Sequence, residues 1–144
     1  MRQTAWLNAA PQRPPEQDAA PQMTRLQRIR KQQKDEDFHP EMPPVETAQH
    51  LLSYLFEVGP SMPGGMSSVP ITHQEIAAWC ELTGITLGPW ESRTLRRLSR
   101  EYVGELHEAS DPKRPAPWRG DMGEVDAAAV ADSLRDSIRS LAKL

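Results

Sequence analysis

Hydrophobic residues recur at helical spacing in the middle of the chain, first over residues 45–58. The stripe follows Pro44, and proline favours the first position of a helix; Gly59 stands where a left-handed residue closes one. This pattern predicts a core helix between Pro44 and Gly59. Its apolar face is predicted to hold Val45, Ala48, Leu52, Leu55 and Phe56.

Two further helices are predicted around a short connection. Thr72 and Glu75 have the spacing of a capping box, which starts a helix, and Gly84 is placed to end it. Pro89 then opens a third helix with Glu91 in its first turn, where a carboxylate suits the helix dipole. The apolar faces are predicted to hold Ile76, Trp79 and Cys80 in the second helix and Leu95, Leu98, Tyr102 and Leu106 in the third. The expected fold is a small all-α core of three helices over residues 45–109.

The loop between the first two helices is predicted over residues 60–70. This stretch holds three prolines and two glycines, which a helix does not tolerate. It also lacks an alternation of polar and apolar residues long enough to predict a strand. No strand is therefore expected in the chain.

The flanks of this core have sparse hydrophobic positions. Residues 1–44 hold seven of the 14 prolines and are predicted to be a mostly disordered, Pro-rich and charged N-terminal arm, in which Thr24–Lys34 could form one short exposed helix. Residues 110–122 are predicted to be a Pro-rich linker. Residues 123–144 are predicted to form an amphipathic C-terminal helix. Its apolar seam consists of Ala127, Val130, Leu134, Ile138 and Leu141.

Composition agrees with this uneven layout. Leu, Ile, Val and Phe account for only 26 of the 144 residues, and 16 of these lie between Val45 and Leu106. No apolar run is long enough to cross a membrane, the first 22 residues lack the apolar run of a secretory signal, and Cys80 is the single cysteine. We therefore expect a soluble cytosolic protein without an intrachain disulfide.

The sequence offers little for catalysis or for a bound cofactor. The four histidines form no H-x-x-x-H pair, and no nucleotide-binding or nucleophile-elbow motif occurs. His73 and Cys80 are two helical turns apart, about 10 Å along the axis, which is too far for a Cys–His ion pair. We expect no enzyme, no metal and no cofactor.

Nucleic-acid binding is an alternative because Arg93, Arg96, Arg97 and Arg100 follow a helix–turn–helix-like layout. Within residues 73–102, however, four glutamates balance the four arginines, whereas a groove-reading protein needs an excess of positive charge. The sequence favours a solvated arginine face with partners such as Glu101 at i, i+4 from Arg97.

Partner-binding residues are expected in the flanks. Trp6 and Trp118 lie in Pro-rich segments with no predicted core beside them, and tryptophan is common at interface anchors. The C-terminal helix has too little apolar surface to be stable alone, so it should pack on the central helices, on a copy of itself or on a partner. The candidate partner-binding residues are Trp6, Trp118, Val130, Leu134, Ile138 and Leu141.

A packing pattern over about residues 45–106 resembles the phage tail assembly chaperone type, small proteins encoded in the tail-gene region of long-tailed bacteriophages. It includes the first predicted helix, with Leu51, Leu52, Leu55 and Phe56, and the glycine-containing loop that follows it. The residues that carry the resemblance are Pro70, Ile71, Glu75, Ile76, Ala78, Trp79, Leu82, Thr83, Gly84, Leu87, Trp90, Glu91, Leu95, Leu98 and Tyr102. Among them, the core signature is Ile76, Trp79, Leu82, Trp90, Leu95, Leu98 and Tyr102, and Trp79 and Trp90 are expected to pack together.

The resemblance implies a non-enzymatic helper in the host bacterial cytoplasm. It would hold the tape-measure protein, or other tail subunits, while the tail tube polymerises. In that group a programmed frameshift often extends a shorter product, and Met23 could serve here as an internal start. The alternatives are a structural tail connector retained in the virion and a DNA-binding adaptor.

Overall fold

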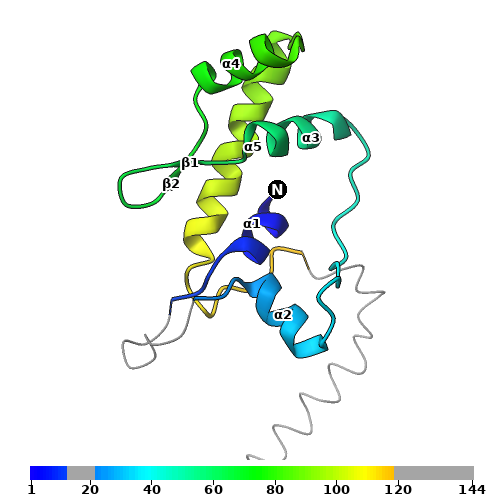
Figure 1. The fold of residues 1–144 in the computed structure, drawn as a ribbon, viewed down its shortest axis with the longest axis vertical. Helices are drawn as coiled ribbons and strands as arrows, with labels where there is room; N and C mark the ends of the chain where they lie inside the picture. The colour runs from blue at the N-terminus through cyan, green and yellow to red at the C-terminus, as the bar shows by residue number, and fades with distance from the viewer. Residues whose placement is uncertain (13–21, 119–144) are drawn as a thin grey trace, which may run out of the picture.

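A single long helix organises the fold in the computed structural model, which describes residues 1–12 and 22–118 (Figure 1). This helix, α5, contacts α1, α3, α4 and β2, while α1 also contacts α2 and α3 also contacts α4. The elements in chain order are α1 (Arg2–Asn8), α2 (Arg25–Gln33), α3 (Gln49–Val58), β1 (Met62–Pro63), β2 (Ser68–Val69), α4 (His73–Thr83) and α5 (Pro89–Glu108). The mainly helical prediction is confirmed.

The ends of α4 and α5 lie where the local signals predict them. The Thr72 hydroxyl accepts a hydrogen bond from the Glu75 amide at 3.2 Å, and Gly84 ends α4 with a left-handed φ of +71°. Pro89 begins α5, and the Glu91 carboxylate accepts a hydrogen bond from the Gly88 amide at 2.7 Å. Each contact satisfies a backbone group that the first or last helical turn leaves without an intrahelical partner.

The first predicted core helix begins later than its sequence pattern indicates. α3 starts at Gln49, because Ala48 has a left-handed φ of +53° that interrupts the helix. The buried face also differs from the predicted one, since Val45, which now precedes the helix, is 38% exposed. Leu51 and Leu55 are buried, whereas the predicted Phe56 is 45% exposed.

A small β-hairpin contradicts the prediction of a chain without strands. Met62 pairs with Val69 and Pro63 with Ser68 in antiparallel register. A Cβ atom on Gly64 would lie 2.4 Å from the backbone oxygen of Ser67, so this tight turn requires glycine. Strands of two residues are too short to produce an alternating pattern, which is why the sequence does not reveal them.

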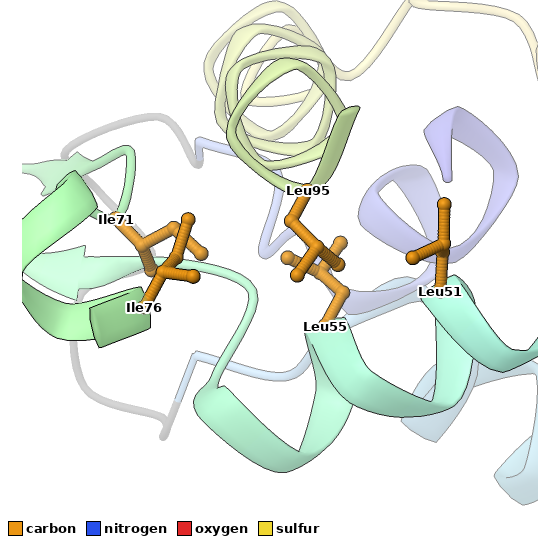
Figure 2. Close-up of a cluster of buried hydrophobic side chains, with 5 residues drawn as sticks. All are labelled: Leu51, Leu55, Ile71, Ile76 and Leu95. Atoms are coloured by element: carbon orange, nitrogen blue, oxygen red, sulfur yellow. The ribbon is translucent and has the colours of Figure 1, made fainter. Parts of the chain in front are cut away.

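The main core lies between α3, α4 and the first half of α5. Figure 2 shows its five buried side chains, with those of Leu55 and Leu95 between α3 and α5. The buried set is Leu51, Leu55, Ile71, Ile76 and Leu95. The Ser99 hydroxyl of α5 binds both ends of the segment between α3 and α4. It accepts a hydrogen bond from the Ile71 amide at 2.9 Å and donates one to the Pro60 carbonyl at 2.8 Å.

The prediction of a disordered N-terminal arm is wrong for much of its length. α1 packs on the second half of α5, where Ala5 forms a second buried cluster with Tyr102 and Val103. α2 follows Thr24, whose side chain forms a capping box with Gln27, and this confirms the short helix at Thr24–Lys34. A helix of seven residues with few large apolar side chains carries too little periodicity to predict α1.

The predictions for the C-terminal part of the chain concern residues that the structure does not describe. The amphipathic helix over 123–144 and the end of the linker over 110–122 lie outside the described residues. Independent folding of residues 45–109 stays a prediction.

Candidate protein-interaction surface

The two tryptophans predicted as docking elements both contact other parts of the chain. The Trp6 indole donates a hydrogen bond to the Arg114 carbonyl at 3.0 Å, and the Arg25 guanidinium carbon lies 4.7 Å from the centroid of its ring. The backbone amide of Trp118 donates to the side-chain oxygen of Gln3 at 3.1 Å. Both residues thus join the N-terminal helix α1 to the segment that follows α5, and their role in partner binding stays a prediction.

The other predicted partner-binding residues cannot be placed on this surface. They are Val130, Leu134, Ile138 and Leu141, and all four lie outside the described residues.

The core signature divides into a buried part and an exposed part. Ile76, Leu95 and Tyr102 are buried, Trp79 is 9% exposed, and Leu98 packs partly buried against the main core. Trp79 pairs with Tyr54 of α3 at a centroid distance of 5.1 Å.

Leu82 and Trp90, by contrast, are not core residues. Leu82 is 87% exposed and Trp90 is 60% exposed, so the expectation that Trp79 and Trp90 pack together in the core is wrong. Leu82 lies in the last turn of α4, about 120° around the helix from Ile76, and Trp90 is the second residue of α5. The end of α4 and the start of α5 lie together at one end of the described part of the molecule (Figure 1). Large apolar side chains exposed at one end of a small protein favour a protein-interaction site.

A basic groove adjoins this exposed end. We use this name for the groove along α5 lined by His73, Trp90, Arg93, Thr94, Arg96, Arg97 and Arg100. Within residues 1–12 and 22–118, none of its four arginines forms a salt bridge, and the expected pair of Arg97 with Glu101 is not formed. The Nε atom of Arg96 is buried and has no hydrogen-bond partner in the same part of the chain. The groove is therefore a concentration of positive charge without a salt bridge among the described residues, although Arg97 and Arg100 also line a neighbouring hollow with Glu101, Glu105 and Glu108.

The opposite end of α5 is held by buried charges that the sequence does not predict. The Glu105 carboxylate is 2% exposed and accepts hydrogen bonds from Arg114 Nη2 at 2.9 Å and from Arg2 Nε at 3.0 Å. Burial raises the pKa of this carboxyl, but the hydrogen bonds from Arg114 and Arg2 outweigh burial, and the net pKa lies below the ordinary glutamate value. Glu105 is therefore ionised at neutral pH and serves the fold.

Arg25 makes the matching contact from α2. Its buried guanidinium donates to the carbonyl of Ala109, and its Nη2 donates to the carbonyl of Asp111 at 2.8 Å. Burial lowers the pKa of Arg25, although a guanidinium remains charged at neutral pH. A cation at the carboxyl end of α5 also compensates the helix dipole. These contacts join residues far apart in the chain, so no local pattern could have predicted them.

The part of the chain that the structure describes shows neither a metal site nor a membrane-spanning helix. No cluster of three or more His, Cys, Asp or Glu side chains is arranged to hold a metal ion there. In the same part of the chain, no helix is long and apolar enough to cross a membrane.

The sequence model of the phage tail assembly chaperone family matches residues 23–104. The match covers more than half of the chain and includes α2 to most of α5, so the protein belongs to this family. It confirms the resemblance found in the packing pattern and indicates a role in tail assembly. No curated protein and no solved structure matches the chain.

Proposed function

We propose that the protein is a non-enzymatic chaperone that binds the tape-measure protein, or another tail subunit, in the host cytoplasm during tail assembly. The observation that carries this proposal is the family match over residues 23–104. Membership of the family indicates a role in tail assembly. The identity of the partner and the mode of action are what we propose.

The arrangement of the surface supports a binding role. α5 is anchored by the main core along its first half, and it presents exposed side chains beside that core, among them Trp90 and the arginines of the basic groove. A rigid helix that displays an aromatic anchor and charges suits recognition of an extended or helical partner segment. Such contacts are individually modest, which allows the partner to be released when the tail tube forms around it.

Co-expression with the tape-measure protein encoded in the same phage or prophage genome is the direct test. A tagged form of this chain should retain the tape-measure protein on an affinity column and keep it soluble. A matched control is the tape-measure protein expressed with an empty vector, which should be largely insoluble. Failure to form a complex with the tape-measure protein or with any tail subunit would refute the proposal.

Mass spectrometry of purified phage particles distinguishes an assembly chaperone from a structural tail connector. An assembly chaperone is released, so its peptides should be absent from mature virions. Stoichiometric amounts in the particle would instead favour the tail connector.

A further inference from the structure

The basic groove has the charge pattern of a binding site for an acidic helical segment. Arg93, Arg97 and Arg100 are exposed on one side of α5, and no carboxylate lines the groove with them. From Arg93 to Arg100 is seven residues, or about 10 Å along the helix axis. A partner helix with carboxylates at i, i+4 and i+7 spans the same length, so it can oppose all three guanidinium groups at once.

Two further features indicate that this face receives a ligand. Arg96 also lines the groove, and its Nε has no hydrogen-bond partner among the described residues, so no carboxylate of this part of the chain pairs with this atom. Trp90 lines the same groove with 60% of its surface exposed, one helical turn before Arg93. Arginine and tryptophan are the side chains most enriched at the energetic centres of interfaces.

Protein fits this face better than nucleic acid does. Glu101 is exposed on α5, the helix that carries the groove arginines, and Glu75 is exposed on α4; both carboxylates would repel the continuous charge of a phosphate backbone. A short protein segment carries only the few carboxylates that the groove can accept. An apolar residue one turn away on such a segment can cover Trp90.

We propose that the basic groove binds an acidic helical segment of the tail partner, with the groove arginines pairing its carboxylates and Trp90 packing on an apolar side chain. This inference rests on the proposed chaperone function, which supplies the partner. It adds the surface and the chemistry by which that partner is recognised.

The primary probe is a fluorescent helical peptide with glutamates at i, i+4 and i+7 and a leucine one turn before the first glutamate. The full-length protein should bind it, and the peptide with glutamines in place of the glutamates should bind at least about tenfold more weakly. Binding should also weaken as NaCl is raised from about 0.05 to about 0.5 M, because salt screens exposed charges.

Variants of the protein locate the interaction. R93E/R97E/R100E should weaken peptide binding by about 100-fold, since three attractive charge contacts become repulsive. The matched control K31E/K34E/K113E reverses three exposed lysines outside the groove and should change binding by less than about threefold. Trp90→Ala should weaken binding by about tenfold without changing its salt dependence, because this loss is apolar. Circular dichroism checks that each variant keeps its helical content.

The outcomes separate this inference from the proposed function. If the tape-measure protein binds R93E/R97E/R100E as tightly as it binds the unmodified chain, the groove assignment is wrong while the chaperone function stands. If the peptide binds as predicted but no tail protein does, the groove chemistry stands and the proposed function fails. If the peptide does not bind, the inference is overturned. It is equally overturned if a 20-base-pair DNA duplex binds the groove more tightly than the peptide and R93E/R97E/R100E abolishes that binding.

Discussion

The two halves of α5 are held by different kinds of contact. The first half packs through apolar side chains of α3 and α4, with Leu55 and Leu95 at the centre of the main core. The second half packs on α1 through a small apolar cluster. Two buried charges are added there, Glu105 of α5 and Arg25 of α2, which binds the carbonyls of Ala109 and Asp111 just after the helix. The stability gained from apolar packing depends on how well the side chains fit together and how fully they are buried. A buried charge, by contrast, destabilises the fold as soon as it loses one of its partners.

This difference explains which half carries exposed interaction residues. The main core fixes the first half of α5 without using its outer face, so Trp90 and the groove arginines remain available to a partner. In the second half, the carboxylate of Glu105 already forms salt bridges with Arg2 and Arg114, so it is not available to a partner. We therefore expect the first half of α5 to recognise the partner, whereas the second half holds α1 and the segment of residues 109–118.

The largest predicted effect on stability comes from the main core. Leu95→Ala should lower the free energy of unfolding by about 3 kcal/mol, because the residue is fully buried and its truncation leaves a cavity. Leu82→Ala is the matched control and should change it by less than about 0.5 kcal/mol, since Leu82 is 87% exposed. Urea denaturation followed by circular dichroism measures both. Equal effects of the two substitutions would contradict the placement of the core.

The next effect tests the buried charge of α2. Arg25→Ala should lower the free energy of unfolding by about 2 kcal/mol, because it removes charged hydrogen bonds to the carbonyls of Ala109 and Asp111. Hydrogen exchange should accelerate most at the carboxyl end of α5. Lys31→Ala, on an exposed position of the same helix, is the control and should leave that exchange unchanged. Uniform acceleration throughout α5 would show that the two halves are not held separately.

A pH-dependent effect tests Glu105. Glu105→Gln should lower the free energy of unfolding by about 1–2 kcal/mol at pH 7, because a buried charged acceptor is lost. The folded pKa of Glu105 lies below its unfolded value, so its stabilisation is complete above the unfolded pKa of about 4.3 and disappears as the pH falls through the folded pKa. The difference between the variant and the unmodified chain should therefore shrink below about pH 4. A difference that stays constant from pH 7 to pH 3 would exclude this ion pair as its cause.

The smallest effect is a gain in stability. Gly104 lies within α5, is exposed, and a Cβ atom added to it would meet no other atom within 4 Å. Gly104→Ala should raise the free energy of unfolding by about 0.5–1 kcal/mol, because alanine has the higher helix propensity. Thermal denaturation should show a small increase in the midpoint temperature. A decrease would mean that something outside the described residues packs closely at this position.

Sequence patterns predicted the features that depend on neighbouring residues. Thr72, Gly84 and Pro89 fix helix ends through local hydrogen bonds and backbone preferences, and Leu95 and Tyr102 follow the helical period of the buried face. These signals act within one or two helical turns. They therefore gave the order and type of the central helices.

Features that depend on distant residues could not be predicted in this way. The contact of Arg2 with Glu105 joins residues 103 positions apart, and it accompanies the packing of α1 on α5. The exposure of Trp90 depends on where α3 and α4 end relative to α5, which no local pattern contains. The groove arginines are visible in the sequence, but only the fold shows that the described residues leave them without carboxylate partners.

Hydrogen–deuterium exchange of the protein with and without the tape-measure protein tests the central claim most directly. We expect slower exchange in the complex along the segment from Leu82 to Arg100, which includes the two exposed apolar side chains and the basic groove. Exchange at the carboxyl end of α5 should change little, because α1 already packs on that half of the helix and Arg25 binds the carbonyls that follow it. A complex that protects only the carboxyl end, with no change between Leu82 and Arg100, would contradict the account.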